Sequence, residues 1–279
     1  MITEVVMPIL AKIAYKLSPR LCFSLQYFHN RHRFPNLSNP KNFSEVIGYQ
    51  IVRGEIDQYY ELVDKIKVRN YLAKWGFADY LPKVYKVWDN ANDIDLTGLP
   101  ERFIIKTNHG SGGHIICKNV NMLNVNDIKE HFDKMLHVVY NPWETQYAKI
   151  QPLVYCEEFI EDGHTIPTDF KYMCLDGEIK AILLCFDRDS NVHKLVYDEN
   201  WNKLPYVKEK AFVGMNYPKP KNLEEMNKIA KQIASRFVQV RVDLYNAFGK
   251  IYIGELTFTA DGGILRTFTD KAIKEMGRK

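Results

Sequence analysis

Apolar residues near the start of the chain recur at the spacing of a helix. They line one face of a helix predicted over residues 2–20: Val5, Val6, Ile9, Leu10, Ile13, Ala14 and Leu17. Lys12, Lys16 and Arg20 lie on the opposite face. An apolar stripe this wide is typical of a helix that packs against its own domain, which is the arrangement we expect. A helix that lies on a membrane surface is the alternative.

Two further stretches predict helices. Residues 30–42 are rich in Asn and Pro and predict a loop, and residues 43–75 then predict one or two helices that end near Gly76. Another helix begins after Asn222, and Glu225 three residues later resembles a capping box. Its apolar residues stand at helical spacing: Leu223, Met226, Ile229, Ala230, Ile233 and Phe237.

Short β-type runs fill the middle and the end of the chain. Three runs predict single strands, over residues 103–107, 114–118 and 153–159. Two pairs of runs predict hairpins, 169–175 with 178–186 around Asp176-Gly177 and 240–246 with 251–258 around Phe248-Gly249. Strands joined by tight turns are antiparallel, and no regular βαβ alternation is present. The predicted fold class is therefore α+β.

Composition narrows the class of protein. The chain has 279 residues, of which 46% are hydrophobic and 26% charged, so it can form a core and is not a disordered chain. Its net charge of +4 does not suggest a nucleic-acid binder. The longest apolar run, Ala181 to Phe186, is too short to span a bilayer.

The cysteines and the N-terminus indicate a cytoplasmic protein. None of the five cysteines pairs at the spacing of a zinc or redox motif, and most lie in apolar runs, so we expect reduced core residues. The N-terminus carries Glu4 and lacks a basic leader, so we do not expect a signal peptide.

A glycine-rich segment follows the strand predicted over residues 103–107. Lys106 comes first, and Gly110, Gly112 and Gly113 come directly after the strand. Such a loop lets backbone N–H groups approach phosphate oxygens, and the lysine adds positive charge. The lysine precedes the glycines, so this is not the Walker pattern. The alternative is an ordinary turn between two strands.

The last predicted hairpin brings two carboxylates together. Arg241, Asp243 and Tyr245 share one strand face, and Ile253, Glu255 and Thr257 share a face of the partner strand. With a loop of about five residues, Asp243 falls opposite Glu255. Two opposed carboxylates repel unless a cation lies between them, and oxygen ligands of this kind suit Mg²⁺. The alternative is a solvent-facing strand pair in which Arg241 neutralises both acids.

Two weaker motifs remain. Glu157 and Glu158 end an apolar strand, where backbone groups can meet a base and a carboxylate can meet a ribose hydroxyl. Asp187 and Asp189 form a D-x-D pair after the apolar run, an arrangement that can bind a metal diphosphate in a glycosyltransferase. D-x-D also occurs often by chance.

Taken in order, these motifs resemble the ATP-grasp superfamily, and more closely its TupA-like family, named for teichuronopeptide synthesis. The resemblance covers roughly residues 40 to 275. Its segments are Leu62 to Lys65, Lys106 to Gly113, Glu157-Glu158, Asp169-Phe170-Lys171, Tyr197-Asp198 with Trp201, Pro218 to Met226, Arg241 to Tyr245, and Gly254 to Thr259 with Gly262-Gly263. The strings Asn-His-Gly-Ser-Gly-Gly and Gly-Glu-Leu-Thr-Phe-Thr are the most specific.

The resemblance implies an ATP-grasp fold in which two α+β subdomains hold ATP between antiparallel sheets. It implies a helical N-terminal segment over residues 1–60, a nucleotide-lid subdomain over 61–160 and a metal-binding subdomain over 161–279. The residues that it implies for the nucleotide are Lys65, Lys106, His109, Gly110, Ser111, Gly112, Gly113, Glu157, Glu158 and Phe159. Lys171 reaches the phosphates, Arg241 stabilises the developing acyl phosphate, and Asp243 and Glu255 hold Mg²⁺.

The sequence departs from the superfamily pattern at Thr257. Many ATP-grasp enzymes have Glu-x-Asn on this strand, whereas here the string is Glu255-Leu256-Thr257. A hydroxyl is a weaker ligand than an amide oxygen, so Thr257 binds a second Mg²⁺ loosely or water takes that place. The first 60 residues also lack the Rossmann-like start of many ligases, which leaves the acceptor site unassigned.

The resemblance implies an ATP-dependent carboxylate–amine ligase that forms an acyl phosphate and ADP. Its substrates would be a hexuronic acid of a bacterial surface polysaccharide and an amino acid, in the cytoplasm or at the inner face of the membrane. A sugar-nucleotide glycosyltransferase and a non-catalytic ATP-binding protein are the alternatives. We also expect that neutralising Asp243 or Glu255 abolishes turnover and, by relieving repulsion, raises the melting temperature.

Overall fold

The structure is a computed structural model that describes residues 15–138, 141, 143–163, 166–188, 192–208 and 214–278. The chain forms two compact units. The first consists of residues 1–59, 141–145 and 161–279, and the second of residues 60–140 and 146–160. Most of the helix predicted over residues 2–20 lies outside the described residues.

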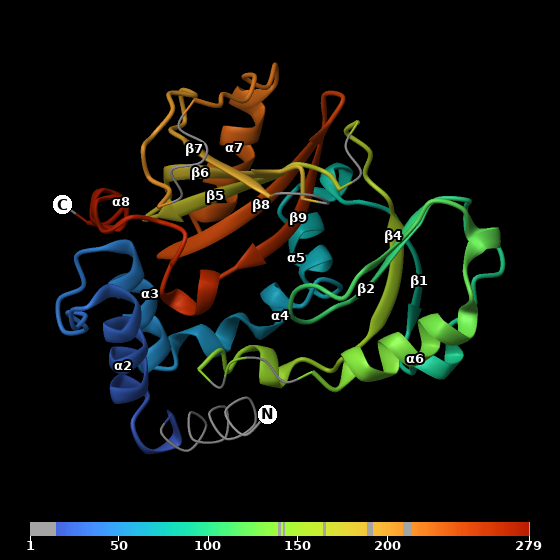
Figure 1. Cartoon of the computed structure of the whole chain (residues 1–279), viewed down its shortest axis with the longest axis horizontal. Coiled ribbons are helices and arrows are strands. Elements are labelled where there is room, and N and C mark those ends of the chain that lie inside the picture. The colour runs from blue at the N-terminus through green and yellow to red at the C-terminus, as the bar shows by residue number, and fades with distance from the viewer. Residues whose placement is uncertain are drawn as a thin grey trace. The chain divides into compact units, whose positions relative to one another are not determined.

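The first unit is built on a five-stranded antiparallel sheet (Figure 1). Its strands run in the order β7-β6-β5-β8-β9. Their bounds are Asp169–Leu175 for β5, Glu178–Phe186 for β6, His193–Tyr197 for β7, Gln239–Ala247 for β8 and Lys250–Thr257 for β9. Both predicted hairpins are confirmed, and each turns through two residues with positive φ: Asp176-Gly177 (53° and 79°) and Phe248-Gly249 (51° and 92°). Positive φ at both positions matches the right-handed twist of paired strands.

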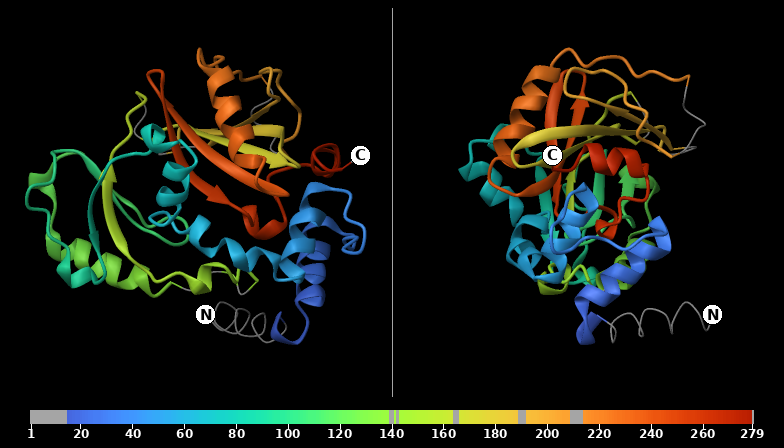
Figure 2. Two further views of the ribbon diagram at one scale, coloured as in Figure 1. Left: turned by 180° about the vertical axis from the view of Figure 1, so that it is seen from behind. Right: turned by 90° about the vertical axis from the view of Figure 1, so that its left-hand side faces the viewer.

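Helix α7 (Leu223–Ala234) packs on one face of this sheet, against β5, β6 and β8 (Figure 2). The residues on its inner side are buried: Leu223, Met226, Ile229, Ala230 and Ile233. The predicted capping box does not form, because the Asn222 side chain makes no cap hydrogen bond. It donates instead to the Gly249 carbonyl oxygen at 2.9 Å, which ties the start of α7 to the β8–β9 turn.

The opposite face of the sheet changes character along β5. Met173 and Leu175 are apolar and share a buried core with Phe23 and Ile47, which belong to α2 (Pro19–Arg31) and α3 (Phe43–Val52). Towards the other end of β5, the same face carries Lys171, and alternation places Asp169 there too. The N-terminal helices therefore share a core with the apolar end of this face, and the charged residues lie towards its other end.

The region predicted as one or two helices between residues 43 and 75 is more broken than expected. It contains α3, a 3₁₀ turn at Glu55–Tyr59, α4 (Tyr60–Val63) and α5 (Val68–Lys74). A capping box that the sequence reading missed begins α3, where Asn42 accepts from the Glu45 N–H and the Glu45 carboxylate accepts from the Asn42 N–H. The short helix α8 (Asp270–Glu275) completes this part of the first unit.

The second unit contains a four-stranded antiparallel sheet in the order β1-β4-β2-β3. Its strands are β1 (Val84–Trp88), β2 (Phe103–Thr107), β3 (Ile115–Cys117) and β4 (Val154–Glu158). Helix α6 (Val125–Leu136) packs its Ile128 and Phe132 into the core of this sheet. The sequence reading found three of these strands and missed β1.

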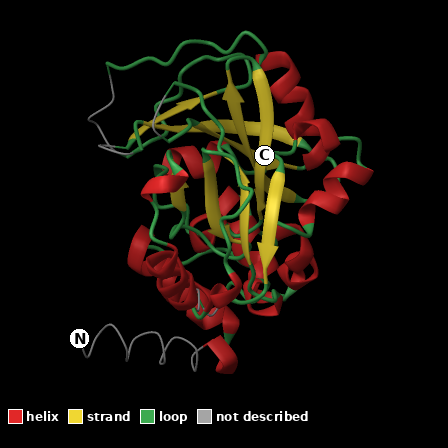
Figure 3. Cartoon of the chain, turned by 90° about the vertical axis from the view of Figure 1, so that its right-hand side faces the viewer, coloured by secondary structure: helices red, strands yellow, loops and turns green. Residues whose placement is uncertain are grey.

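Both units mix helices with antiparallel strands, which confirms the predicted α+β class (Figure 3). All five cysteines are buried and carry free thiols, as expected. Within the described part of the chain, no helix has the length and apolar character needed to cross a bilayer.

Candidate active site

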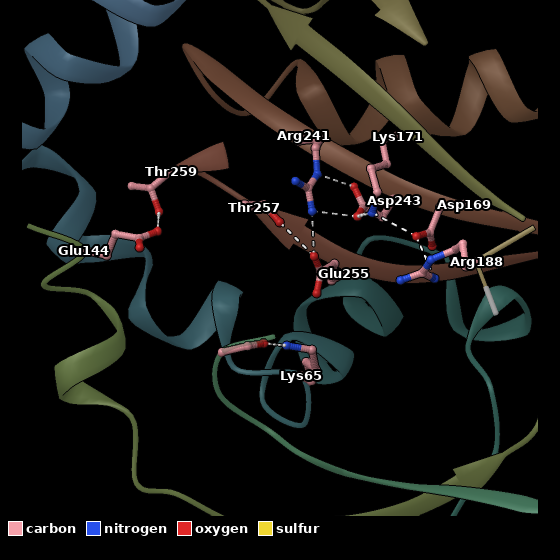
Figure 4. Close-up of polar contacts among 11 residues, drawn as sticks. Lys65, Glu144, Asp169, Lys171, Arg188, Arg241, Asp243, Glu255, Thr257 and Thr259 are labelled. Carbon is pink, nitrogen blue, oxygen red and sulfur yellow. Dashed lines mark hydrogen bonds and ion pairs between the residues drawn. The ribbon is translucent and has the colours of Figure 1, made fainter. Parts of the chain in front are cut away.

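Arg241 lies between the two carboxylates of the β8–β9 hairpin (Figure 4). Its guanidinium donates to Asp243 Oδ1 at 2.6 Å and Oδ2 at 2.7 Å. The same group donates to Glu255 Oε1 at 2.7 Å. Asp243 is 2% exposed, whereas the Glu255 side chain is 27% exposed. The alternative of a solvent-facing strand pair is therefore wrong for Asp243, which is buried. The same alternative expected Arg241 to pair with both acids, and the structure shows this pairing.

Two further cations and one further acid extend this network along β5 and β6. Lys171 Nζ lies 2.7 Å from Asp243 Oδ2 and 3.1 Å from Asp169 Oδ2. Arg188 in turn lies 2.8 Å from the same Asp169 oxygen. Three cations and three carboxylates thus alternate across the charged end of the sheet face, and their formal charges balance.

Burial and pairing act in opposite directions on these groups. Burial disfavours the charge on Arg241 and Lys171, but the neighbouring carboxylates outweigh it, and the pKa of each cation is raised. Burial also raises the pKa of Asp243, an effect that Arg241 and Lys171 oppose. The two cations therefore remain charged, and Asp243 is the carboxylate that they share.

The register of the hairpin depends on a β-bulge at Gly254. Asp243 pairs with Glu255 but Leu244 pairs with Ile253, which leaves Gly254 as the extra residue. The turn has two residues, not the expected five, and without the bulge its register would place Asp243 opposite Gly254. The bulge also breaks the alternation, so the prediction that Ile253 shares the face of Glu255 is wrong: Ile253 pairs with the buried Leu244.

The bulged position also explains the glycine. A Cβ on Gly254 would stand 2.7 Å from the Tyr245 ring, closer than such contacts occur. A side chain at position 254 would therefore require the Tyr245 ring to move.

The two predicted nucleotide lysines both contact other residues of the second unit. Lys106 on β2 forms an ion pair with Glu157 on β4 and lies over the Tyr155 ring, 5.8 Å from its centroid. Lys65 Nζ donates to the Gly110 carbonyl oxygen at 2.6 Å. The structure thus brings together four predicted nucleotide residues within one unit: Lys65, Lys106, Gly110 and Glu157.

The glycine-rich loop has the backbone that only glycine adopts readily. Gly110, Gly112 and Gly113 have φ of 67°, 79° and 65°. Ser111 and Gly112 are exposed at its tip, and nothing lies within 4 Å of a Cβ built on Gly112. Gly113 instead packs against the Met135 side chain, and His131 Nε2 lies 2.7 Å from its carbonyl oxygen. The loop is anchored to α6 at Gly113 and open at its tip.

A buried polar cluster that the sequence reading did not single out supports this loop. Asn108 donates to Asp64 Oδ2 and to the Gln151 carbonyl oxygen, both at 3.0 Å, and accepts from the Leu153 N–H at 2.8 Å. Asn108 and Asp64 are 0% and 1% exposed. They stand directly beside Lys65 and His109 in the sequence, so their contacts fix where the predicted nucleotide residues lie.

Of the remaining predicted nucleotide residues, Glu158 and Phe159 lie at the end of β4 and His109 follows β2. Glu158 Oε2 accepts from the Lys83 N–H at 3.2 Å, and Phe159 packs beneath Arg102, whose guanidinium is 5.7 Å from the ring centroid. Burial and the nearby Lys65 lower the pKa of His109. His109 is 4% exposed, so it lies inside the unit and not on the loop surface.

The comparison with known families decides what kind of protein carries these features. A sequence model described as TupA-like ATP-grasp matches residues 45–279. The chain belongs to the TupA-like ATP-grasp family. The resemblance inferred from the motifs is confirmed, and so is the predicted ATP-grasp fold.

Several solved structures are similar to this TupA-like ATP-grasp protein. One is D-alanine–D-alanine ligase from Bacillus anthracis complexed with ATP, which is 18% identical with a TM-score of 0.42. The match covers 71% of this chain and 55% of that ligase. D-cycloserine synthetase DcsG matches at 14% identity and a TM-score of 0.45, over 77% and 68% of the two chains. A RimK domain ATP-grasp protein from Sphaerobacter thermophilus DSM 20745 matches at 9% and 0.41, over 84% and 70%. The chain thus spans less than two thirds of the Bacillus anthracis ligase, and a search of curated proteins gives no match.

In this TupA-like ATP-grasp protein, the oxygens of the hairpin fit Mg²⁺ by their chemistry. Asp243 and Glu255 offer carboxylates, and the Thr257 hydroxyl, which donates to Glu255 Oε1 at 3.1 Å, stands beside them. No group of three His, Cys, Asp or Glu side chains within the described residues could hold a metal. Repulsion between Asp243 and Glu255 does not by itself require Mg²⁺, because Arg241 already provides a cation between the two acids.

The D-x-D pair, which suggested a glycosyltransferase, is described only at Asp187, and that residue is already paired. Asp187 Oδ2 lies 2.9 Å from His193 Nδ1 at the start of β7. Asp189 lies outside the described residues.

Proposed function

We propose that this protein is an ATP-dependent carboxylate–amine ligase that releases ADP. The observation that supports this best is the buried network of Arg241, Asp243 and Lys171 on the strands that carry the family motif. Burying so many charges gives little net stability, because desolvation offsets much of the attraction between them. Such an arrangement is typical of a catalytic site.

The residues of the first unit would serve the reacting phosphoryl group. Arg241 and Lys171 would neutralise charge on the phosphoryl oxygens. Asp243, Glu255 and Thr257 would hold Mg²⁺, which when bound supplies further charge neutralisation. Arg241 would have to exchange part of its contact with Glu255 for substrate. Since Glu255 is the more exposed of the two acids, this exchange requires little rearrangement.

The residues of the second unit would hold the nucleotide. Lys65 and Lys106 would contact its phosphates, and the backbone N–H groups from His109 to Gly113, including Ser111, would cover them. Glu157, Glu158 and Phe159 would meet the adenine and ribose. The open tip at Gly112 leaves room for a phosphate to approach the backbone.

The reaction has two steps. A carboxylate oxygen of the acceptor attacks the γ-phosphorus of ATP, the bond to the β-phosphate oxygen breaks, and an acyl phosphate and ADP form. The nitrogen of an amine then attacks the acyl carbon, inorganic phosphate leaves, and the amine nitrogen loses a proton to give an amide. Charge develops on the phosphoryl oxygens in both steps, and the guanidinium of Arg241 is suited to stabilise it.

For the substrates, we propose a uronic acid of a bacterial surface polysaccharide or its precursor, and an amino acid as amine. The support for this substrate class is the family name, which refers to teichuronopeptide synthesis. A cytoplasmic location, where ATP is available, goes with this proposal.

Measurement of ADP release over pairs of uronic acids and amines tests the proposal. ADP formation that depends on both substrates and on Mg²⁺ supports it. Release of UDP from a sugar nucleotide would favour the glycosyltransferase, and tight ATP binding without either activity would favour a non-catalytic nucleotide-binding protein.

A further inference from the structure

Helix α2 has one buried face and one exposed face, and both are apolar (Figure 1, dark blue). Phe23 and Tyr27 are 1% and 0% exposed and belong to the core that α2 shares with α3. Leu21, Leu25 and Phe28, which helical spacing gathers on the other side, are 56%, 51% and 43% exposed. One side of α2 therefore holds the helix to the unit, and the other presents large apolar side chains to solvent.

The exposed side extends beyond the helix at both ends. Leu17 is 81% exposed just before the helix begins. Phe34 is 62% exposed after the helix ends, and its ring stacks on that of Phe28 with centroids 4.8 Å apart. We refer to Leu17, Leu21, Leu25, Phe28 and Phe34 as the apolar face of α2. Clustered exposure of this kind marks an interaction surface, whereas single exposed apolar residues are common.

The segment that carries this face is basic. Residues 5–44 contain six Lys or Arg residues and no Asp or Glu, although the whole chain carries only +4. Arg31 is buried against backbone carbonyls and Asp270, and Arg33 pairs with Glu45 at 3.6 Å, whereas Lys16 and Arg20 are exposed. A second copy would bring the same positive charge against this face, so like charges would oppose self-association.

We propose that the apolar face of α2 docks on the surface of an anionic lipid bilayer. The Leu and Phe side chains would enter the boundary between headgroups and acyl chains, and the basic residues would meet the lipid phosphates. The sequence expectation of a helix that packs on its own domain concerned residues 2–20, whereas this proposal concerns α2. Such docking would bring the first unit, with its charged sheet face, to a membrane.

Vesicle flotation with the full chain tests this proposal. We expect binding to vesicles of phosphatidylcholine mixed with phosphatidylglycerol, little binding to phosphatidylcholine alone, and weaker binding at high salt. The double variant Leu25→Ser/Phe28→Ser should bind the anionic vesicles at least about tenfold more weakly. Met122→Ser is the matched control, because Met122 is 83% exposed elsewhere in the chain and should have no effect.

Melting temperatures close to that of the wild type would show that the variants are folded. If the double variant does not fold, Lys16→Gln/Arg20→Gln provides the test, since both side chains are exposed and the change should weaken binding to the anionic vesicles. Absence of wild-type binding to the anionic vesicles, or equal binding by a folded double variant, would overturn the proposal. The proposal would also be overturned if light scattering shows that the wild type forms a dimer that the double variant does not form, and if the wild type does not bind vesicles.

Discussion

At the scale of single residues, Asp243 has both a chemical and a structural role. Arg241 and Lys171 are both paired to its carboxylate, so Asp243→Asn removes the acid that the two buried cations share and leaves Arg241 with Glu255 and Lys171 with Asp169. We expect this variant to lose ADP formation and to be destabilised by about 3–5 kcal/mol, the usual effect of breaking a buried ion pair. Chemical denaturation measures the second effect. The structure thus reverses the expectation, drawn from sequence, that the melting temperature rises.

Glu255→Gln is the matched comparison for Asp243→Asn. The Glu255 side chain is more exposed than that of Asp243, so we expect lost turnover with a much smaller loss of stability. Equal destabilisation by the two variants would contradict the difference in burial on which this prediction rests.

His109 gives a prediction for pH dependence. Its folded pKa is lowered by burial and by Lys65, while an unfolded histidine titrates near about 6.5. Below that pH the unfolded chain binds a proton that the folded chain does not, so stability falls as the pH falls. The unfolding free energy of His109→Gln, measured between pH 7.5 and pH 5, should fall less steeply than that of the wild type. The exposed His29→Gln should retain the wild-type slope, and a wild-type slope in His109→Gln would contradict the assignment.

At the scale of elements, the bulge at Gly254 sets the geometry of the hairpin. Gly254→Ala places a Cβ against the Tyr245 ring and should destabilise the protein by about 1–3 kcal/mol. In the background Tyr245→Ala the same change should have less effect, because the ring that obstructs it is gone. A double-mutant cycle in chemical denaturation measures this coupling, and strictly additive effects would show that the contact does not constrain the bulge.

The loop after β2 gives a test of nucleotide binding. Lys106→Ala and deletion of Gly112 should each weaken calorimetric ATP affinity, because the lysine supplies charge and the glycine permits close backbone approach. Lys86→Ala is the matched control: Lys86 lies on β1 in the same sheet and also pairs with an acid, Asp95. Unchanged affinity for Lys106→Ala and the deletion would remove the phosphate assignment.

The sequence predicted hairpins well where turn chemistry decides them. Asp176-Gly177 and Phe248-Gly249 placed two strand pairs correctly, because Asp and Gly tolerate the positive φ of such turns. Phe248 adopts a positive φ that is unusual for a bulky residue. The bulge escaped prediction, since an isolated glycine in a strand does not reveal whether it inserts an extra residue. Strand β1 was missed because its side chains are mostly half-buried and its pairing with β4 is far away in sequence.

At the scale of the whole molecule, the motifs identified the family, but contacts between distant strands decided the network. Asp243 and Glu255 were expected to meet, and they do. Lys171 on β5 pairs with Asp243 on β8, and no local sequence pattern predicts this contact. The hydrogen bond from the Thr259 hydroxyl to Glu144, at 2.6 Å, could not be predicted for the same reason, because 115 positions separate the two residues in the sequence.

We propose that the network of Arg241, Asp243, Lys171 and Glu255 serves ATP-dependent ligation. The most direct test of this proposal is ADP release in the presence of Mg²⁺, a uronic acid and an amino acid, for the wild type, Glu255→Gln and the control Asp95→Asn. We expect turnover that requires both substrates in the wild type and in the control, and its loss in a folded Glu255→Gln. Near-normal Mg²⁺-dependent ADP formation by Glu255→Gln would contradict the assignment of this hairpin to catalysis.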